Sequence, residues 1–312
     1  MRIAVIGAGA IGSLFGGLLA KNGNDVTLIG RKDHVEAIRR LGLRIEGIQH
    51  CTVRDLWAVS DIDEVERRKY DLLLLTVKAY STVQALSVAR GLIKGGTPLL
   101  CLQNGLGVEE LAMKLVQRED LMRGVTGCAA ILDRPGVIIH TGMGETVIGE
   151  LSGKITPRAQ IVAEAFNSSG LTTKVTHNIS DAVWMKTLVN AGINPFAALT
   201  GMKNGELIKV DGLRGLMVET VEEGRKVAER LGVELSGDPV LQMLTVAELT
   251  SENINSMLID VERGRPTEID FINGAISHVG GQVGVPTPLN RILTQLVKAK
   301  ASKVSERIVE RR

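Results

Sequence analysis

The stretch that decides the fold is RIAVIGAGAIGSLFGGLLAKNGNDVTLIGR, residues 2–31. It starts with a short apolar run typical of a β-strand and passes through the glycine pattern GAGAIG. A segment with helical spacing follows and closes at Gly23, and NDVTLIGR then predicts a second strand. Strand, glycine-rich turn, helix and strand in this order are the setting in which the spacing GxGxxG indicates dinucleotide binding.

The glycines of this turn have separate expected roles. Gly7 permits a tight turn, Gly9 lets the backbone approach a pyrophosphate, and Gly12 lets the helix pack closely on the strand. An anion at this place would meet free N–H groups and the positive end of the helix dipole. A glycine-rich turn that packs without a ligand is the alternative. The predicted cofactor turn consists of Gly7, Ala8, Gly9, Ala10, Ile11 and Gly12.

The end of the second strand bears on the choice of cofactor. An NAD-binding protein usually has Asp or Glu there to hold the ribose 2′-hydroxyl, but this chain reads IGRKDH. Arg31 and Lys32 are cations where a 2′-phosphate would need one, and the guanidinium fork suits phosphate. The sequence therefore favours NADP over NAD. A solvated basic pair at a strand end is the alternative.

Two further strand ends carry polar residues. The runs YDLLLLTVKAY and TPLLCLQNG read as buried strands, with STVQALSVARGLI as a helix between them. Ligands of open α/β sheets lie beyond the carboxyl ends of the strands, which is where Lys78 and Asn104 stand. Contact with a cofactor or substrate is one interpretation of both residues, and turn formation is the other.

The alternating pattern changes near residue 121. Residues 121–150 have β-type runs broken by Gly and by DRPG, as in a meander or hairpin, and a helix over 156–169 and the strand LTTKVTH follow. We place the domain boundary near 177, because the rest of the chain is mostly helical. The expected helices cover residues 181–199, 206–232, 237–249, 252–263, 267–283 and 287–304, and Gly201, Gly232, Gly264 and Gly284 stand near helix ends.

Length and composition limit the function classes. A chain of 312 residues favours two domains, and 44% hydrophobic with 23% charged residues is typical of a globular protein. Aromatic residues make up 3% and the net charge is +2, which argues against a nucleic-acid partner. Residues 3–20 carry no charge and resemble a membrane span, but their five glycines fit the turn better, so we expect no membrane association.

The spacing of the cysteines and of the possible metal ligands argues against two kinds of site. The three cysteines, Cys51, Cys101 and Cys128, form no CxxC pair, which argues against a disulfide framework and suits the reducing cytoplasm. No cluster of His, Asp or Glu has convincing metal-ligand spacing, so we expect no metal. Nothing in the helical half specifies an oligomer, and a homodimer is left open.

The segment WMKTLVNAGINP, residues 184–195, is unusual within the helical half. Lys186, Asn190 and Asn194 are spaced four apart and share one side of a helix. Apolar residues fill the positions between them, so the helix looks buried most of the way around. Because an ammonium and two carboxamides in such surroundings cost free energy unless they are satisfied, a functional role is favoured over an exposed polar stripe.

A second unusual segment is SENINSMLIDVERGRPTEID, residues 251–270. Asn253 and Ser256 lie three apart, which places them on one face of the expected helix. Helix capping offers an alternative account of the end of this segment. Thr267 could be an N-cap with Asp270 at the third helical position, and Glu268 would then be a first-turn acid.

Taken together, the chain resembles the ketopantoate reductase (2-dehydropantoate 2-reductase) family over nearly its whole length. The motifs that carry the resemblance are, in chain order, GAGAIG, TVKAY, LQNG, WMKTLVNAGINP with NGEL, NSM and GRPTEID. The family reduces 2-dehydropantoate to pantoate with NADPH on the route to pantothenate and coenzyme A. The chain departs from the family where the usual Ser-Ser-Met is Asn255-Ser256-Met257, and where Lys32 follows Arg31.

The resemblance assigns roles to particular residues. It implies that Lys186 and Glu268 are catalytic, with Lys186 as the general acid. The substrate-binding residues that it implies are Lys186, Asn190, Asn194, Asn204, Asn253, Ser256 and Glu268. Outside the glycine turn, the cofactor-binding residues that it implies are Arg31, Lys78, Asn104 and Glu268. The active-site asparagines of the family include the position of Asn104.

The chemistry of these residues agrees with a ketone reduction. Hydride transfer to a carbonyl carbon builds negative charge on the oxygen, which an ammonium can stabilise and protonate. We expect a Rossmann-type α/β domain over 1–177 that binds NADPH and an all-helical substrate domain over 178–312, with the reaction in the cleft between them. Two alternatives remain: a related 2-oxo acid or 3-hydroxy acid oxidoreductase, and a sensor that binds NADP without turnover.

Overall fold

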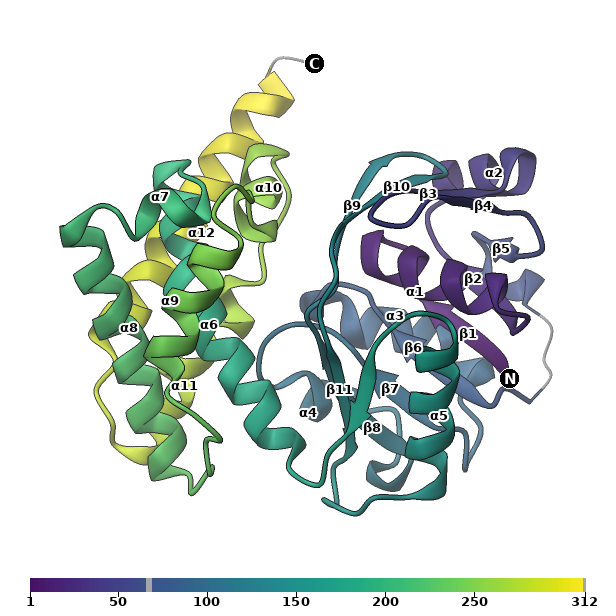
Figure 1. Cartoon of the computed structure of the whole chain (residues 1–312), viewed down its shortest axis with the longest axis horizontal. Coiled ribbons are helices and arrows are strands. Elements are labelled where there is room, and N and C mark those ends of the chain that lie inside the picture. The colour runs from purple at the N-terminus through teal and green to yellow at the C-terminus, as the bar shows by residue number, and fades with distance from the viewer. Residues whose placement is uncertain (66–68, 311–312) are drawn as a thin grey trace. The chain divides into compact units, whose positions relative to one another are not determined.

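The computed structural model describes residues 1–65 and 69–310, and the chain divides into two compact units (Figure 1). The first unit comprises Met1–Gln103 and Val108–Ile179. The second comprises Asn104–Gly107 and Ser180–Arg312. One short loop from the first half of the chain is therefore grouped with the helical second half, and this loop includes Asn104.

The first unit is built on an eight-stranded sheet of order β12-β11-β8-β7-β6-β1-β2-β5. Neighbouring strands are parallel except for β8 and β11, which are antiparallel. Its strands are β1 (Arg2–Ile6), β2 (Asp25–Ile29), β5 (Trp57–Val59), β6 (Leu72–Leu75), β7 (Leu99–Cys101), β8 (Leu121–Thr126), β11 (Thr146–Glu150) and β12 (Thr173–Val175). The four leucines of β6 are fully buried, as expected for a central parallel strand that is covered on both faces.

A second, four-stranded sheet of order β4-β3-β10-β9 completes the β-structure of this unit. Its strands are β3 (Leu43–Gly47), β4 (Cys51–Val53), β9 (Ala129–Arg134) and β10 (Val137–Gly142). The predicted hairpin at DRPG is confirmed, because β9 and β10 pair antiparallel across it. The flanking strands β8 and β11 pair with each other in the large sheet, so the hairpin is an insertion between two neighbouring strands.

Helix α1 (Ala10–Lys21) lies between the two sheets (Figure 1). A Cβ atom on Gly16 would come within 2.4 Å of Leu28 in the large sheet. A Cβ atom on Gly17 would come within 2.8 Å of Leu43 in the small sheet. The helix is apolar on all sides because it is covered on all sides, which accounts for the uncharged run 3–20. Among the described residues, no helix is both long and apolar enough to cross a membrane.

The remaining helices of the first unit are α2 (Lys32–Leu41), α3 (Thr82–Val88), α4 (Val108–Ala112) and α5 (Pro157–Ser168). Short 3₁₀ turns lie at Ile62–Glu64, Ala79–Ser81, Ala89–Leu92 and Arg118–Asp120. Helix α5 begins as the sequence predicts: Thr156 caps it by accepting a hydrogen bond from the N–H of Ala159, and Pro157 occupies the first helical position.

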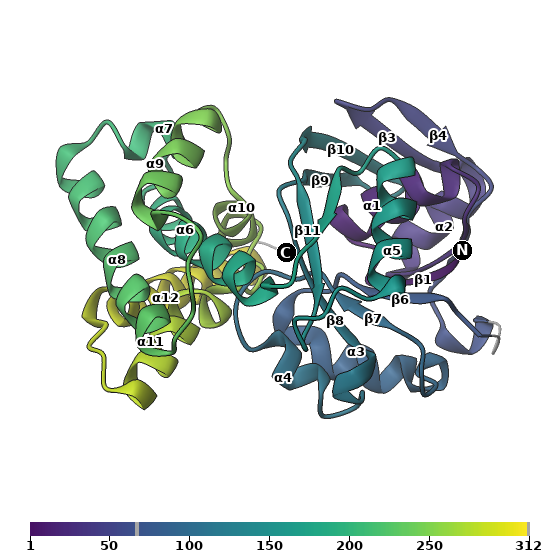
Figure 2. The same cartoon turned by 60° about the horizontal axis from the view of Figure 1, so that its bottom comes forward.

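Within the described residues from 180 onwards, the second unit contains helices and no strands (Figure 2). Its helices are α6 (Ile179–Thr200, which starts at the boundary), α7 (Asn204–Leu207), α8 (Asp211–Arg230), α9 (Pro239–Leu249), α10 (Ser256–Glu262), α11 (Asn273–Val283) and α12 (Pro288–Glu310), with a 3₁₀ turn at Ile269–Phe271. The expectation of a Rossmann-type α/β region followed by an all-helical region is confirmed.

Small residues let these helices pack closely. A Cβ atom on Gly192 of α6 would lie 2.6 Å from Val221 of α8 and 2.9 Å from Met243 of α9. Gly224 of α8 in turn receives Leu188 of α6, at 2.4 Å from its ideal Cβ position. Leu188 and Gly192 are one helical turn apart and form the core face of α6, on the side away from Lys186 and Asn190.

Two predicted helices are divided in the structure. The range 206–232 covers the end of α7 and all of α8. The backbone N–H groups of Asn204 and Gly205 donate to the carbonyls of Asn253 and Ser251 and hold α7 as a separate turn. The range 267–283 contains α11 only from Asn273 onwards. The predicted helix ends at glycine are confirmed by four residues with positive φ, namely Gly201, Gly232, Gly264 and Gly284.

Candidate active site

The glycine turn of the first unit is closed by contacts that leave no room for side chains. Gly7 has φ +111°, and a Cβ atom on Gly12 would lie 2.2 Å from the Gly7 oxygen and 2.4 Å from Thr76 Oγ1. The Thr76 hydroxyl donates a hydrogen bond to the Gly7 carbonyl at 2.8 Å. Helix α1 therefore starts directly against the end of β6, as expected for Gly12.

Gly9 differs from these two glycines because protein atoms leave its surroundings open. The nearest atom to an ideal Cβ on Gly9 is the Gly7 oxygen, at 4.0 Å. Gly9 is the N-cap of α1 and offers no side-chain hydrogen bond, so the first-turn N–H groups of Ala10, Ile11 and Gly12 lack a helical acceptor. Open space beside N–H groups that lack a helical acceptor fits the pyrophosphate of a dinucleotide.

Arg31 lies beside this turn. It directly precedes α2, its side chain is exposed, and it has no ion pair with any residue that the structure describes. Gly30 brings the end of β2 to the turn, because a Cβ on Gly30 would be 2.7 Å from the Cβ of Ala8. Lys32 behaves differently, since its ammonium is 3.8 Å from the Glu36 carboxylate.

Lys78 leaves the sheet at the same edge. The registers place Ile6, Ile29, Leu75 and Cys101 level across β1, β2, β6 and β7, so the segments after these strands start from one edge. Lys78 is half-buried and caps the 3₁₀ turn after β6. Its carbonyl accepts a hydrogen bond from Ser81 at 2.8 Å, so this residue also forms a turn.

A buried histidine that no sequence motif indicates connects the first turns of α1 to neighbouring elements. The backbone N–H of Gly136 donates to His34 Nδ1 at 2.9 Å, so Nε2 carries the proton and donates to Ser13 Oγ at 2.9 Å. His34 thus connects α1, α2 and the turn of the β9–β10 hairpin. Burial lowers the pKa of His34 and favours this neutral form.

In the second unit, the loop Asn104–Gly107 is fixed against residues 268–271. Asn104 Nδ2 donates to Glu268 Oε2 at 3.3 Å, and the N–H of Leu106 donates to the Phe271 carbonyl at 2.8 Å. Gly105 has φ +90°, and a Cβ there would be 2.4 Å from the Phe271 oxygen. Glu268 is buried. The structure therefore brings together two predicted site residues that are 164 positions apart.

The capping alternative holds only for Thr267, whose Oγ1 accepts a hydrogen bond from the N–H of Ile269 at 3.4 Å. No α-helix starts at Thr267, and Glu268 instead precedes a single 3₁₀ turn whose Phe271 and Ile272 N–H groups donate to its carbonyl. Asp270 pairs with Lys298 at 3.0 Å rather than completing a capping box. The carboxylate of Glu268 is thus available for the amide of Asn104.

Asn204 is the centre of a small hydrogen-bond cluster. Its Nδ2 donates to Thr250 Oγ1 at 2.9 Å, its Oδ1 accepts from Asn255 Nδ2 at 3.2 Å, and its N–H donates to the Asn253 carbonyl at 3.1 Å. Because these bonds use both ends of the buried carboxamide, Asn204 holds the segment 250–255 in place. The predicted contact of Asn204 with the substrate stays a prediction.

The expectation that Asn253 and Ser256 share a helix face is wrong. Helix α10 starts only at Ser256, and Asn253 lies in the preceding turn, where its N–H donates to Thr250 O at 2.9 Å. The cause is Asn255, which caps α10 by accepting a hydrogen bond from the N–H of Leu258 at 3.1 Å. An asparagine directly before the helical run, which can act as its N-cap, is the sequence feature that indicates this start.

Helix α6 carries the predicted set of Lys186, Asn190 and Asn194 along one side, as the spacing predicts. Lys186 and Asn190 are half-buried and Asn194 is buried, with Trp184 and Met185 among the buried neighbours. The helix continues through Pro195 to Thr200. Polar groups on this largely buried helix are therefore not an ordinary solvent-exposed stripe.

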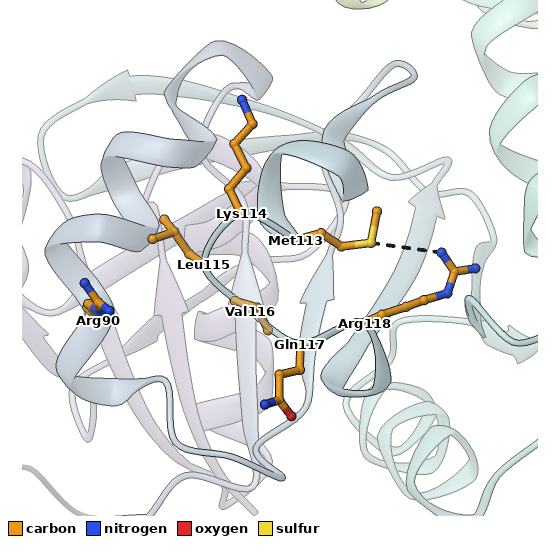
Figure 3. A pocket seen from close by; sticks show the side chains of 7 residues that line it. All are labelled: Arg90, Met113, Lys114, Leu115, Val116, Gln117 and Arg118. Atoms are coloured by element: carbon orange, nitrogen blue, oxygen red, sulfur yellow. Dashed lines mark hydrogen bonds between the residues drawn. The ribbon is translucent and has the colours of Figure 1, made fainter.

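Outside these regions, a surface hollow of about 390 Å³ lies in the first unit (Figure 3). It is lined by Arg90, Met113, Lys114, Leu115, Val116, Gln117 and Arg118. Its three cationic side chains point in different directions, and Arg118 turns to Met113 Sδ (Figure 3). They do not converge on a common point. Within the described part of the chain, no three His, Cys, Asp or Glu side chains are grouped to hold a metal ion.

Comparison with known proteins decides the family. A family model described as "Ketopantoate reductase PanE/ApbA" matches residues 3–153, and its C-terminal counterpart matches residues 178–301. The chain belongs to the ketopantoate reductase family. The resemblance of the motifs is thereby confirmed, and membership of this family makes the chain an oxidoreductase. The two matched ranges cover the α/β region except α5 and β12, and most of the helical region.

Ketopantoate reductase relatives match nearly the full length. A 2-dehydropantoate 2-reductase of Pyrococcus horikoshii is 44% identical, over 97% of this chain and 98% of its own length. One of Streptococcus pyogenes is 33% identical, over 96% of this chain and 98% of its own length. Similarity thus extends through both units.

Solved structures agree with this. A PanE/ApbA family ketopantoate reductase of Ralstonia eutropha has a TM-score of 0.90 at 32% identity, covering 97% of this chain and 99% of that one. A D-mandelate dehydrogenase solved with NADH and anilino(oxo)acetate also has a TM-score of 0.90, at 33% identity and the same coverage. The shared fold thus carries a nicotinamide cofactor in a structural neighbour.

Proposed function

We propose that this protein reduces 2-dehydropantoate to (R)-pantoate with NADPH, with Lys186 as the general acid. The observation that carries the proposal is the polar face of α6, where an ammonium and two carboxamides lie on a largely buried helix. A family relative that is 44% identical is named for this reaction, which supports the choice of substrate.

The residues of the second unit would have separate roles in proton donation, substrate orientation and carboxylate binding. The Lys186 ammonium stabilises the negative charge that grows on the ketone oxygen and delivers a proton to it. Glu268, held by the amide of Asn104, accepts a hydrogen bond from the terminal hydroxyl of the substrate and helps to orient Lys186. The predicted donors to the substrate carboxylate are Asn190, Asn194, Asn253 and Ser256. Asn204 supports them by holding residues 250–255.

The residues of the first unit would hold the cofactor. When bound, the nicotinamide supplies the hydride. The unpaired N–H groups in front of Gly9 suit the pyrophosphate, the exposed Arg31 guanidinium suits a ribose 2′-phosphate, and Lys78 stands at the same sheet edge. We therefore assign residues 1–177 to a cofactor domain and 178–312 to a substrate domain. The proposed reaction requires that the nicotinamide bound by the glycine turn and the ammonium of Lys186 act on the same substrate carbonyl.

A second candidate function rests on a specific likeness. The D-mandelate dehydrogenase structure, solved with NADH, matches this chain with the same TM-score as the ketopantoate reductase structure. A related 2-oxo acid reductase, with a different acid as substrate, is therefore the alternative. A protein that binds NADP without turnover is less favoured, because such a protein has no use for a proton donor at residue 186.

One steady-state assay separates these possibilities. A panel of 2-oxo acids is reduced with NADPH and, separately, with NADH. We expect kcat/KM to be highest for 2-dehydropantoate, by about tenfold or more over other acids, and higher with NADPH than with NADH. Best turnover of a different acid supports the alternative substrate, and binding of NADPH without any turnover supports the sensor.

The surroundings of the thiols fit a reducing compartment. Cys51, Cys101 and Cys128 are all unbridged, and burial raises the pKa of Cys101 to about 12, so its thiol stays protonated and unreactive. We therefore propose that the protein works in the cytoplasm. A homodimer stays a prediction, which sedimentation of the purified protein would test.

A further inference from the structure

Helix α6 contains a proline in its interior, and this proline has a definite consequence. Pro195 has no N–H, so the carbonyl four residues earlier, that of Ala191, loses its helical donor. Ala191 is completely buried, and a buried carbonyl without a partner is costly. The affected turn lies between Asn190 and Asn194, in the middle of the proposed catalytic face.

Asn273, the first residue of α11, supplies the missing donor. Its Nδ2 donates to the Ala191 carbonyl at 3.2 Å and to Asn290 Oδ1 at 3.0 Å, so both amide hydrogens have acceptors. Asn273 is fully buried. Its Oδ1 has no hydrogen-bond partner among the described residues. An apolar side chain of similar shape would avoid that cost, so packing alone does not account for an asparagine here.

The direction of the Asn273 amide is set from the other side of the bundle. Asn290 of α12 donates through Nδ2 to the Thr220 carbonyl at 3.0 Å and to Glu223 Oε2 at 2.9 Å. Glu223 also accepts from the backbone N–H groups of Leu289 and Asn290, at the start of α12. Because Thr220 O and Glu223 Oε2 both accept from Asn290 Nδ2, the Oδ1 of Asn290 faces Asn273. Asn273 therefore donates to it through its NH₂ group.

We propose that Asn273 is a positioning residue for the catalytic face of α6, because it replaces the hydrogen bond that Pro195 removes. This inference rests on the proposed function of Lys186. Proline kinks helices where the ladder is interrupted, and a bend at Pro195 would shift Asn194 relative to Lys186. Misplacement of about 1 Å can cost about 100-fold in rate, so the bond matters to turnover as well as to folding.

A double-mutant cycle tests the dependence on the proline. Pro195→Ala restores an N–H that can bond Ala191 O, which makes Asn273 dispensable. We expect Asn273→Ala to lower kcat by about 10- to 100-fold in the native background and by less than about threefold in the Pro195→Ala background. The KM for NADPH should not change in either background, whereas a general loss of folded protein would lower the active fraction in both.

Thr220→Val is the matched control. It removes a fully buried hydroxyl in the same bundle, and among the residues that the structure describes that hydroxyl bonds only the Leu216 carbonyl of its own helix. Its effect on kcat should be small and the same with and without Pro195→Ala. If this control shows the same dependence on residue 195 as Asn273→Ala, the effect is general loosening and the proposal is overturned.

Every other outcome is decisive as well. An equal loss of kcat from Asn273→Ala in both backgrounds overturns the positioning role, as does failure of both proteins to fold. If the double variant folds and turns over substrate whereas Asn273→Ala by itself does not fold, the positioning role is supported. If the unaltered protein turns over a different 2-oxo acid, the cycle is run with that acid and the role is judged separately from the substrate. If it turns over none, the proposed function fails and the positioning role fails with it.

Discussion

Helices α1 and α6 are both nearly apolar and both largely enclosed, yet the roles that we propose for them depend on different groups. Helix α1 offers backbone N–H groups at its first turn, and its glycines leave space for a ligand and for two sheets. Helix α6 offers side chains along its length, and its neighbours must satisfy the polar groups that it buries. Adding a side chain at a glycine should therefore disturb α1, whereas removing a hydrogen-bonding side chain should disturb α6.

The two helices also differ in where their supporting residues come from. The turn before α1 is closed mainly by its own glycines and by Thr76, directly after the adjacent strand β6. The face of α6 depends on Asn273 and, through Asn290, on Glu223. Substitutions in α1 should therefore act through local fit, whereas substitutions near α6 should be coupled over a long sequence distance.

The largest effect should come from the side-chain half of this comparison. Lys186→Ala should lower kcat by about 100-fold or more, the usual scale for loss of a general acid, with little change in NADPH affinity. Lys209→Ala, which removes an exposed ammonium from the same unit, is the control and should have no effect on kcat. Full turnover by a folded Lys186→Ala protein would remove this residue from the mechanism.

A pair of glycine variants tests the backbone half. Gly12→Ala places a methyl group 2.2 Å from the Gly7 oxygen, so it should cost about 1–3 kcal/mol of stability as well as cofactor binding. Gly9→Ala meets no protein atom closer than 4.0 Å, so it should fold normally and weaken cofactor binding by about tenfold or more. Thermal unfolding and calorimetric titration with NADPH measure the two effects. Undiminished binding by Gly9→Ala would contradict the pyrophosphate site.

These differences explain which features the sequence could predict. The glycine turn is local, so spacing alone predicted Gly7, Gly9 and Gly12 in their observed geometry. The cover of α1 by a second sheet was not predictable, because that sheet pairs β3 with β10, about ninety residues later in the chain. The same limit applies to His34, whose Nδ1 partner is 102 positions away.

The helical half was predictable in outline for similar reasons. Spacing placed Lys186, Asn190 and Asn194 on one side of α6, and glycines marked several helix ends. The link between Asn104 and Glu268 came from resemblance rather than from spacing, since no local pattern joins residues 164 positions apart. The role of Asn273 had one local signal, Pro195 inside a helical run, which shows that a carbonyl needs a donor without showing which residue gives it.

A smaller effect should appear in cofactor preference. Arg31→Ala should weaken NADPH binding by roughly tenfold or more and change NADH binding little, because a charge-assisted hydrogen bond to the 2′-phosphate would be lost. Lys32→Ala is the matched control next to it, and its smaller effect is expected because Lys32 is already near Glu36. Equal weakening of both dinucleotides by Arg31→Ala would contradict the role in 2′-phosphate binding.

The smallest effect concerns pH and belongs to the unit that contains α1. Burial lowers the pKa of His34 in the folded protein, whereas histidine in an unfolded chain titrates near 6.5. Burial also lowers the pKa of His140, against the opposing hydrogen bond to Gly142 O. Below about pH 6.5 the unfolded chain therefore binds protons that the folded chain does not. The free energy of unfolding should decrease as the pH is lowered through this range, and these histidines should not change it at higher pH.

Urea unfolding at pH 8 and pH 5.5 measures this dependence, and the two tryptophans report on different units. Trp57 is exposed in the first unit and Trp184 is buried in α6. In single-tryptophan variants, Trp57 should report a loss of stability at the lower pH, and His34→Gln should reduce that loss because glutamine cannot take up the proton. An unchanged pH dependence in His34→Gln would show that protonation of His34 does not destabilise the support of the glycine turn. The contrast between α1 and α6 would then rest on the turn alone.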